Sequence, residues 1–324
     1  MRSYNNLWEK FISKDNFILA YKNSIKGKGK QKQVRVFKEN WEINLEKVRQ
    51  LVIDGKFHTS QYREMIIFEP KKRIVYKLPY NPDRIVQHAI MNVLKPIFLN
   101  LFIQNTYACI ENRGQHKASV KCSEYVRKNK YCLKCDIKKF YPSINQNILS
   151  EKLHRIIHDK KFMSIIDDVI FSFPGGYNCP IGNYCSQWFG NYYLSFLDNF
   201  IKHDLKCHDY ERFCDDFLLF SNNKDYLNHC KKEIEKYLRE KLNLSFSKCD
   251  LFQTKQGVDF CGYRHFGKYV LLRKSTARRI KKKNRKLRKI KKPDDPYYIN
   301  FKASVKGWLS HSCSYNFLNS MDLL

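Results

Sequence analysis

The 324-residue sequence predicts an α+β fold with antiparallel strands and a helical C-terminal region. Three stretches indicate this. Residues 62–80 place apolar runs on both sides of a polar turn, which is typical of a β-hairpin. Most other strand candidates lie within 131–264, whereas the last 60 residues show apolar spacing typical of helices. We therefore expect a sheet in the middle of the chain and helices at its end.

Positive charge is the most unusual feature of the composition. The 61 Lys and Arg residues exceed the 31 Asp and Glu residues and give a net charge of +30, which predicts a polyanionic partner such as nucleic acid. A hydrophobic content of 43% is enough to form cores, so the chain is not a disordered tail. The longest apolar stretch, 89–103, is interrupted and too short for a membrane span. We expect a soluble, cytoplasmic protein without a membrane partner.

The first 130 residues combine helical patterns with two polar loops. The segment 22–35 is rich in Lys and Gly and suits a flexible surface loop that contacts phosphates. The hairpin at 62–80 should turn at 69–72. Helical spacing then begins at Ile85, and Asp83 is positioned to cap this helix.

The twelve cysteines are scattered singly through apolar segments, which is typical of reduced thiols. Cys132 and Cys135 form the only close pair. Their spacing suits zinc, but no second Cys or His pair accompanies them. Buried core thiols on a strand are the favoured interpretation, and a metal site is the alternative.

Acidic residues stand out at two places in this basic chain. Asp136 ends a strand-like run, and Asp215 and Asp216 lie between two apolar runs that predict a hairpin with the acids at its turn. Adjacent carboxylates in an apolar hairpin are costly unless a cation neutralises them. Mg²⁺ prefers a few carboxylates together with substrate phosphates. The pair taken alone is equally compatible with ordinary turn aspartates.

The segment 273–292 predicts a basic helix. It contains thirteen Lys or Arg residues and no acid, and its apolar stripe consists of Ala277, Ile280, Leu287 and Ile290. Such a helix can dock one narrow face and offer the rest to phosphates, although a solvated charged face is the alternative. The residues expected to contact nucleic acid are Arg273, Lys274, Arg278, Arg279, Lys282, Arg285, Lys286 and Lys289. Two short helices anchored by Trp308 and Phe317 should follow.

The order and spacing of several blocks resemble the reverse transcriptases. The blocks are PKKRIVYKLPYNPDRIVQHAI, LKCDIKKFYPSI, IGNYCSQWF, YERFCDDFLLF, SFSKCDLF and VDFCGY, and the resemblance extends from about Asn6 to Leu318. It implies a right-hand polymerase fold, with fingers and an N-terminal extension over 1–130, an RRM-like palm over 131–264 and a helical thumb over 265–324. It also implies RNA-directed DNA synthesis with two Mg²⁺ ions, for which Mn²⁺ is a possible substitute.

The resemblance assigns roles to the acidic residues. Asp136 and Asp215 would bind both metal ions, Asp216 would contribute more weakly, and the Ile137 carbonyl would complete the coordination. Lys248 matches a lysine that assists pyrophosphate departure, with a solvated surface lysine as the alternative. The box that is usually YxDD in this family is FCDD here. Both acids remain, so we expect altered nucleotide handling at most.

The resemblance also implies a nucleotide site. The residues that would contact the incoming nucleotide or the nascent base pair are Lys72, Arg73, Ile137, Phe140, Tyr141, Ile181, Gly182, Ser186 and Gln187. Tyr141 would lie under the sugar and exclude a 2′-hydroxyl, and a core aromatic is the alternative. Arg84 could equally contact the triphosphate or form an ion pair within the protein. Gly262 resembles the turn that supports the primer end.

Three blocks resemble more narrowly the reverse transcriptases of diversity-generating retroelements. The blocks are IGNYCSQ, TYACIENRGQHKA and GWLSHSCSYNF. At the position of IGNYCSQ, group II intron and retron-like enzymes more often carry QGxxxSP. This implies error-prone, adenine-mutagenised cDNA, copied from a template-repeat RNA for retrohoming into a variable gene of a bacterium or phage. Residues such as Arg73 and Ile181 would loosen selection against mispairs.

That subgroup implies a set of partners. They are template RNA, cDNA, deoxynucleoside triphosphates and a small basic pentameric accessory protein. Two alternatives remain open. A retron or antiphage-defence reverse transcriptase would share every catalytic residue, and a nonenzymatic RNA-binding protein could have kept the fold.

Overall fold

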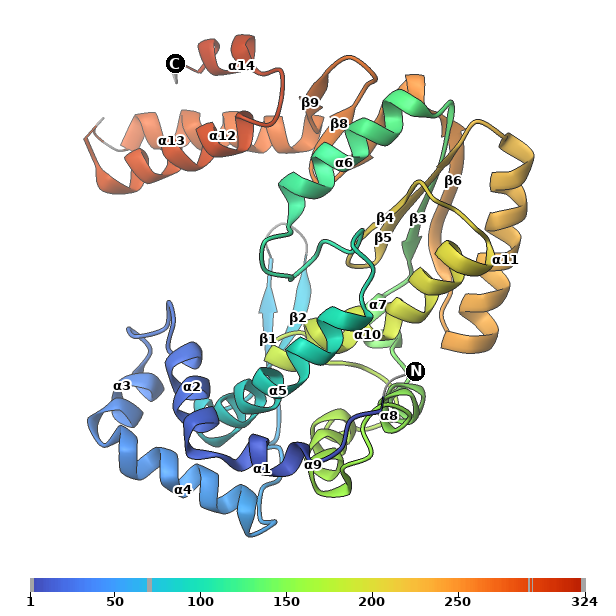
Figure 1. Ribbon diagram of the computed structural model, residues 1–324. Coiled ribbons are helices and arrows are strands. Elements are labelled where there is room, and N and C mark those ends of the chain that lie inside the picture. The colour runs from blue at the N-terminus through green and yellow to red at the C-terminus, as the bar shows by residue number, and fades with distance from the viewer. Residues whose placement is uncertain (1–2, 69–71, 291, 293, 322–324) are drawn as a thin grey trace. The chain divides into compact units, whose positions relative to one another are not determined.

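The computed structural model describes residues 3–68, 72–290, 292 and 294–321 (Figure 1). The chain forms two compact units, each made of separate segments. The first unit comprises residues 1–103, 138–200 and 235–245, and the second comprises 104–137, 201–234 and 246–324.

The first unit is mainly helical. Its helices are α1 (Leu7–Ile12), α2 (Lys14–Ser24), α3 (Lys32–Glu39), α4 (Trp41–Ile53), η1 (Tyr80–Arg84), α5 (Ile85–Leu101), α7 (Phe140–Ser143), α8 (Gln146–His154), α9 (Lys160–Phe171) and α10 (Tyr184–Asn199). Most residues of α5 are buried, because α2 and α10 both pack against it. A helix that is apolar on most sides is typical of such a central position.

A β-hairpin also belongs to the first unit. Strands β1 (Arg63–Ile67) and β2 (Arg73–Lys77) pair antiparallel, as predicted (Figure 1). Of the predicted turn at 69–72, Glu69, Pro70 and Lys71 lie outside the described residues. The capping prediction for Asp83 is wrong. Asp83 lies within η1, and the N-cap residue of α5 is Arg84, without a side-chain cap. The buried carboxylate of Asp83 instead accepts a hydrogen bond of 2.8 Å from the backbone N–H of Ser60.

The second unit contains the larger sheet. Its elements are α6 (Gln115–Lys128), β3 (Tyr131–Ile137), η2 (Phe200–Asp204), β4 (Tyr210–Phe213), β5 (Asp216–Ser221), α11 (Lys224–Leu242), β6 (Phe246–Gln253), η3 (Thr254–Gln256), β7 (Val258–Phe260), β8 (Tyr263–His265), β9 (Val270–Leu272), α12 (Lys274–Ile290), α13 (Pro296–Leu309) and α14 (Tyr315–Asn319). The first residue of η2 and the end of α11 belong to the first unit. Strands β4, β5, β3 and β6 form an antiparallel sheet in that order, and β7, β8 and β9 form a second one. The predicted α+β class is confirmed.

One face of the four-stranded sheet changes from apolar to charged residues along β3. Side chains alternate between the two faces of a strand, so Cys132, Lys134 and Asp136 share a face. At the Cys132 end this face is apolar, because residues of α6, β5 and β7 pack there in one hydrophobic cluster. Figure 1 shows α6 beside the small sheet. Apolar packing therefore ends before the acidic end of β3.

The basic C-terminal helix is confirmed as α12. Ile280 is buried against α13 and Met321, and Leu287 is buried as well, but Ile290 is 63% exposed, so the apolar stripe is shorter than predicted. Asn284 takes a place on the buried face, where its side chain accepts a hydrogen bond from the hydroxyl of Tyr298. Figure 1 shows α12 and α13 side by side. The two short helices expected after α12 are confirmed as α13 and α14.

All twelve cysteines are free thiols. Cys132 and Cys135 are fully buried, and the Sγ atom of Cys135 lies 3.3 Å from that of Cys249 on the neighbouring strand. Within the described residues, no group of three or more His, Cys, Asp or Glu side chains could hold a metal ion. The interpretation of these cysteines as core thiols is confirmed. None of the described helices is long and apolar enough to span a membrane.

Two buried histidines predict loss of stability in acid. Burial lowers the pKa of His88 to about 3 and that of His265 to about 4, and the cations Arg84 and Lys95 also lower the pKa of His88. The unfolded chain therefore binds protons below about pH 6.5 that the folded chain does not. The stabilisation is complete above that pH and is lost as pH falls towards the folded-state values. At pH 5 we expect a loss of about 2 kcal/mol for each histidine.

Urea unfolding at pH 7.5 and pH 5 measures this loss. His88→Phe keeps a ring against Tyr184, on which His88 stacks at 3.8 Å, and should lose about half as much stability as the wild type. His229→Gln changes an exposed histidine on α11 and should retain the full loss. An equal pH dependence in the wild type and His88→Phe would contradict the prediction.

Candidate active site

The three acids predicted from the sequence meet at one end of the four-stranded sheet. Asp136 on β3 lies directly opposite Asp216 on β5, so their side chains share a face. Cys214 and Asp215 connect Phe213 to Asp216 as a two-residue turn, and Cys214 adopts a φ of 57°. The backbone N–H of Ile137 donates to the carbonyl of Asp215 at 3.3 Å, which ties this turn to the end of β3.

The charges at this end repel one another. The pKa of Asp216 is raised to about 6, mainly by burial and also by the nearby charges of Asp136 and Asp215, although Lys134 opposes the shift. The Nζ atom of Lys134 lies 3.5 Å from Oδ2 of Asp216. The other oxygen, Oδ1, is buried and has no hydrogen-bond partner among the described residues. A cation beside Oδ1 would remove this cost.

Residues of β6 contact Asp136 from its other side. The Ser247 hydroxyl donates to the Asp136 carboxylate, and Lys248 lies opposite Asp136 across the β3–β6 pair. Lys248 is exposed. The order Asp216, Asp136, Lys248 therefore runs across three adjacent strands and brings two carboxylates and one ammonium group to the same end of the sheet.

The acids fit Mg²⁺ chemically, although they do not enclose an ion by themselves. Carboxylate oxygens are the hard donors that Mg²⁺ prefers, and this ion commonly takes only one or two carboxylates and completes its shell with water and phosphate oxygens. The absence of a complete metal cluster among the described side chains is compatible with that chemistry. The unpartnered Oδ1 of Asp216 is the observation that supports the fit.

In the first unit, several of the predicted nucleotide residues lie around a turn that precedes α10. The backbone N–H of Tyr76 on β2 donates to the carbonyl of Ile181 at 2.9 Å. Gly182 has a φ of 128°, and a Cβ atom there would lie 2.2 Å from the carbonyl oxygen of Tyr76. Strand β2 therefore packs directly on this turn, with the exposed Lys72 and Arg73 where the strand begins.

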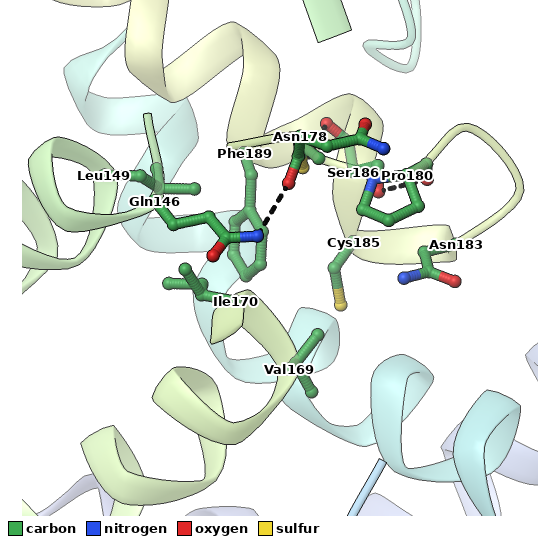
Figure 2. A pocket seen from close by; sticks show the side chains of 11 residues that line it. Gln146, Leu149, Val169, Ile170, Asn178, Pro180, Asn183, Cys185, Ser186 and Phe189 are labelled. Atoms are coloured by element: carbon green, nitrogen blue, oxygen red, sulfur yellow. Dashed lines mark hydrogen bonds between the residues drawn. The ribbon is translucent and has the colours of Figure 1, made fainter. Parts of the chain in front are cut away.

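A small pocket lies behind the same turn, and Ser186 is part of its lining (Figure 2). Ser186 is buried, and its hydroxyl donates to the carbonyl of Pro180 at 2.7 Å. On the other side of the pocket, the side chain of Gln146 donates to the carbonyl of Asn178 at 3.1 Å (Figure 2). Ser186 therefore fixes the turn from within, whereas Gln187 on α10 is exposed.

The two aromatic residues of α7 have different environments. Phe140 is 3% exposed and belongs to the core, whereas Tyr141 is half-buried. Their ring centroids are 5.1 Å apart. The carbonyl of Tyr141 accepts a hydrogen bond of 2.9 Å from the N–H of Cys179, which fixes its backbone. Tyr141 is the one of the two that retains exposed surface.

Two of the predicted cationic contacts have unexpected surroundings. Arg273, which precedes α12, forms an ion pair with Asp259 and is therefore engaged within the second unit, whereas the predicted cations of α12 itself are exposed. Arg84 forms no ion pair with the acids that the structure describes, and its buried Nε lacks a hydrogen-bond partner there. The internal ion pair considered for Arg84 is thus not formed with these acids.

Sequence reasoning missed three side chains at the acidic site. Lys134 lies two residues before Asp136, and the period of a strand could have placed it on the same face. No pattern in the sequence indicated that Ser247 contacts Asp136. The thiol of Cys109 hydrogen-bonds with that of Cys214, which lowers the pKa of Cys109 and raises that of Cys214. These two cysteines are too far apart in the sequence to suggest contact.

Comparisons with known proteins agree with this geometry. Residues 69–265 match the model of a family described as reverse transcriptase (RNA-dependent DNA polymerase). Apo telomerase from Candida tropicalis is similar in structure at 13% identity and a TM-score of 0.53, over 74% of this chain and 53% of that chain. Telomerase from Candida albicans, in complex with the TWJ fragment of telomeric RNA, is similar at 10% identity and a TM-score of 0.51, over 83% of this chain and 60% of that chain.

These two likenesses concern the fold alone, because the identities are low. The chain spans only 53% and 60% of the two telomerase chains. No curated protein matches the sequence. The family match covers more than half of the chain and includes all three acids. The protein therefore belongs to the reverse transcriptase family.

Proposed function

We propose that this protein is an RNA-directed DNA polymerase. The observation that carries the proposal is the meeting of Asp136 with the Asp215–Asp216 turn at one end of a sheet face whose opposite end is apolar. Burial, together with the nearby charges of Asp136 and Asp215, raises the pKa of Asp216 to about 6, a cost that a structural role alone does not explain. The right-hand division into fingers, palm and thumb forms part of this proposal.

The three acids would hold two Mg²⁺ ions, or Mn²⁺ in their place. Such ions activate the attacking 3′-hydroxyl and stabilise the leaving pyrophosphate. Lys134 contacts Asp216 and partly offsets the repulsion among the acids. Lys248 would neutralise charge on the departing phosphate, and Lys72 and Arg73 would bind the triphosphate. The side chain of Tyr141 would exclude a ribose 2′-hydroxyl.

The nucleic acid partners would be template RNA and the growing cDNA, with deoxynucleoside triphosphates as substrates. The exposed cations of α12 support this, because they lie on a helix that buries Ile280 and Leu287 and leaves its Lys and Arg side chains accessible. Binding through such a surface should depend steeply on salt concentration.

Primer extension tests the proposed activity. The purified protein is given an annealed primer on an RNA template, deoxynucleotides and either Mg²⁺, Mn²⁺ or EDTA. We expect extension with either metal ion and none with EDTA. A folded protein that binds RNA but extends no primer with any metal ion would instead support a nonenzymatic RNA-binding role.

We further infer that the enzyme serves a diversity-generating retroelement. Support comes from the sequence blocks IGNYCSQ, TYACIENRGQHKA and GWLSHSCSYNF. The biological product would be adenine-mutagenised cDNA from a template-repeat RNA, made with a small basic pentameric accessory protein. A retron or antiphage-defence enzyme is the alternative, and it would show no excess of errors at template adenines.

Ile181→Asn tests the origin of adenine infidelity. The substitution adds a polar group beside the nascent base pair and should lower misincorporation opposite template adenine several-fold. Only the side chain changes, so the carbonyl of residue 181 still accepts the hydrogen bond from Tyr76. Sequencing of cDNA from the wild type, Ile181→Asn and the apolar control Ile181→Val measures the effect. Equal error spectra in all three would contradict the hypothesis.

A further inference from the structure

Gly190 occupies an unusual position for a glycine. It lies in the interior of α10, where glycine is among the poorest helix formers. Its backbone does not adopt a positive φ, so conformational freedom is not the reason for a glycine there. The remaining explanation is steric: a side chain at this position would have to fit between the helix backbone and neighbouring atoms.

The atoms that restrict this space belong to α7. A Cβ atom on residue 190 would lie 3.1 Å from Cε1 of Phe140 and 3.1 Å from Cε1 of Tyr141. Carbon atoms pack optimally at about 3.5–4.0 Å, so both rings are closer than an added methyl group allows. Gly190 thus permits the rings of Phe140 and Tyr141 to rest on the backbone of α10.

The two rings differ in their exposure to solvent. Phe140 is 3% exposed and is held by the core, whereas Tyr141 is half-buried. The backbone of Tyr141 is fixed through its carbonyl, which accepts hydrogen bonds from Cys179 and Ile144. A methyl group on residue 190 would therefore displace the Tyr141 ring towards its exposed side by rotation of the side chain.

We propose that Gly190 is a positioning residue that sets how far the Tyr141 ring projects, and thereby the selection of deoxynucleotides over ribonucleotides. This rests on the proposed function, in which Tyr141 borders the sugar of the incoming nucleotide. A ring displaced towards its exposed side leaves less space for the sugar. The loss is more severe for ribose, which carries an additional hydroxyl group.

Single-nucleotide incorporation on an RNA template tests the proposal with Gly190→Ala. We expect the KM for the deoxynucleotide to rise five- to tenfold while kcat stays within twofold. The ratio of kcat/KM for the deoxynucleotide to that for the ribonucleotide should rise at least fivefold. An equal fall for both nucleotides, with the ratio unchanged, would reveal a merely structural role and overturn the proposal.

Two further variants isolate the contact. On a Tyr141→Ala background the displaced ring is absent, so adding Gly190→Ala should leave the nucleotide ratio unchanged within twofold. Gly307→Ala replaces another helix-interior glycine, on α13, whose Cβ would meet nothing within 4 Å, and it should behave like the wild type. A change of the ratio on the Tyr141→Ala background would contradict the proposal.

Folding is checked by thermal unfolding of every variant. If Gly190→Ala does not fold, the double variant with Tyr141→Ala has lost one of the two close rings and should fold. Its failure to fold would assign the obstruction to Phe140 and overturn the proposal. A wild type that incorporates no nucleotide would contradict the proposed function, whereas an active wild type with an unaltered ratio in Gly190→Ala contradicts only this inference.

Discussion

Asp215→Asn is expected to abolish metal-dependent extension of a primer on RNA while RNA binding stays nearly intact. The substitution keeps the size of the side chain and removes its charge at the turn that is tied to the end of β3. Polymerisation depends mainly on positioning and charge neutralisation, so loss of one metal ligand should reduce the rate at least ~10³-fold. RNA affinity is shared among many phosphate contacts and should change little.

Extension rates and RNA dissociation constants, measured on the same preparation, check this prediction. Asp225→Asn provides a control, because Asp225 is an exposed acid at the start of α11 and loses the same charge away from the site. We expect the control to extend primers at the wild-type rate. Undiminished extension by Asp215→Asn would refute the enzyme proposal, and a parallel loss of RNA binding would indicate misfolding of the turn.

Local sequence patterns predicted the elements that carry the acids. The apolar runs around Asp215 and Asp216 predicted a hairpin, and the run before Asp136 predicted a strand that ends there. Both are confirmed as β4–β5 and β3. Which acid faces Asp136 could not be predicted in this way. Register depends on the turn, and Cys214 at a φ of 57° gives no signal, because glycine or asparagine is usual at such a position.

Predictions failed where partners distant in the sequence determine the environment. Asp83 is expected from the sequence to cap a helix, but it lies within η1 before the N-cap residue Arg84, and its carboxylate accepts a hydrogen bond from the N–H of the distant Ser60. Ile290 continues the spacing of the apolar stripe, but the neighbouring cluster of Val305, Leu309 and Met321 packs on Ile280 instead. Helical period therefore predicted α12 itself, whereas the extent of its buried face depends on tertiary contacts that follow no local pattern.

Gly182 admits the close approach of another backbone within the protein itself. That backbone is Tyr76 of β2. The resemblance placed this position beside the nucleotide and the template. The structure adds that the same glycine joins the hairpin to the turn before α10, which gives it a structural role that a family motif does not reveal.

Gly182→Ala is expected to lower the free energy of unfolding and to reduce extension strongly. The new Cβ would lie 2.2 Å from the carbonyl oxygen of Tyr76, a backbone atom that cannot rotate away, and the φ of 128° is itself unfavourable for alanine. Strain and overpacking together should cost about 2–4 kcal/mol. Relief of the clash requires the turn to separate from β2, which breaks the Tyr76–Ile181 hydrogen bond.

Gly175→Ala separates the two causes. Gly175 also has a positive φ, of 95°, but an added Cβ would meet nothing within 4 Å. This control should therefore lose only the cost of backbone strain, about 1 kcal/mol, and retain wild-type extension. Gly182→Ala should in addition raise the KM for deoxynucleotides at least tenfold, because Lys72 and Arg73 lie where β2 begins and lose their anchor. Urea unfolding and steady-state extension measure both effects. If the two variants behave alike, the packing of β2 on the turn does not contribute to nucleotide binding.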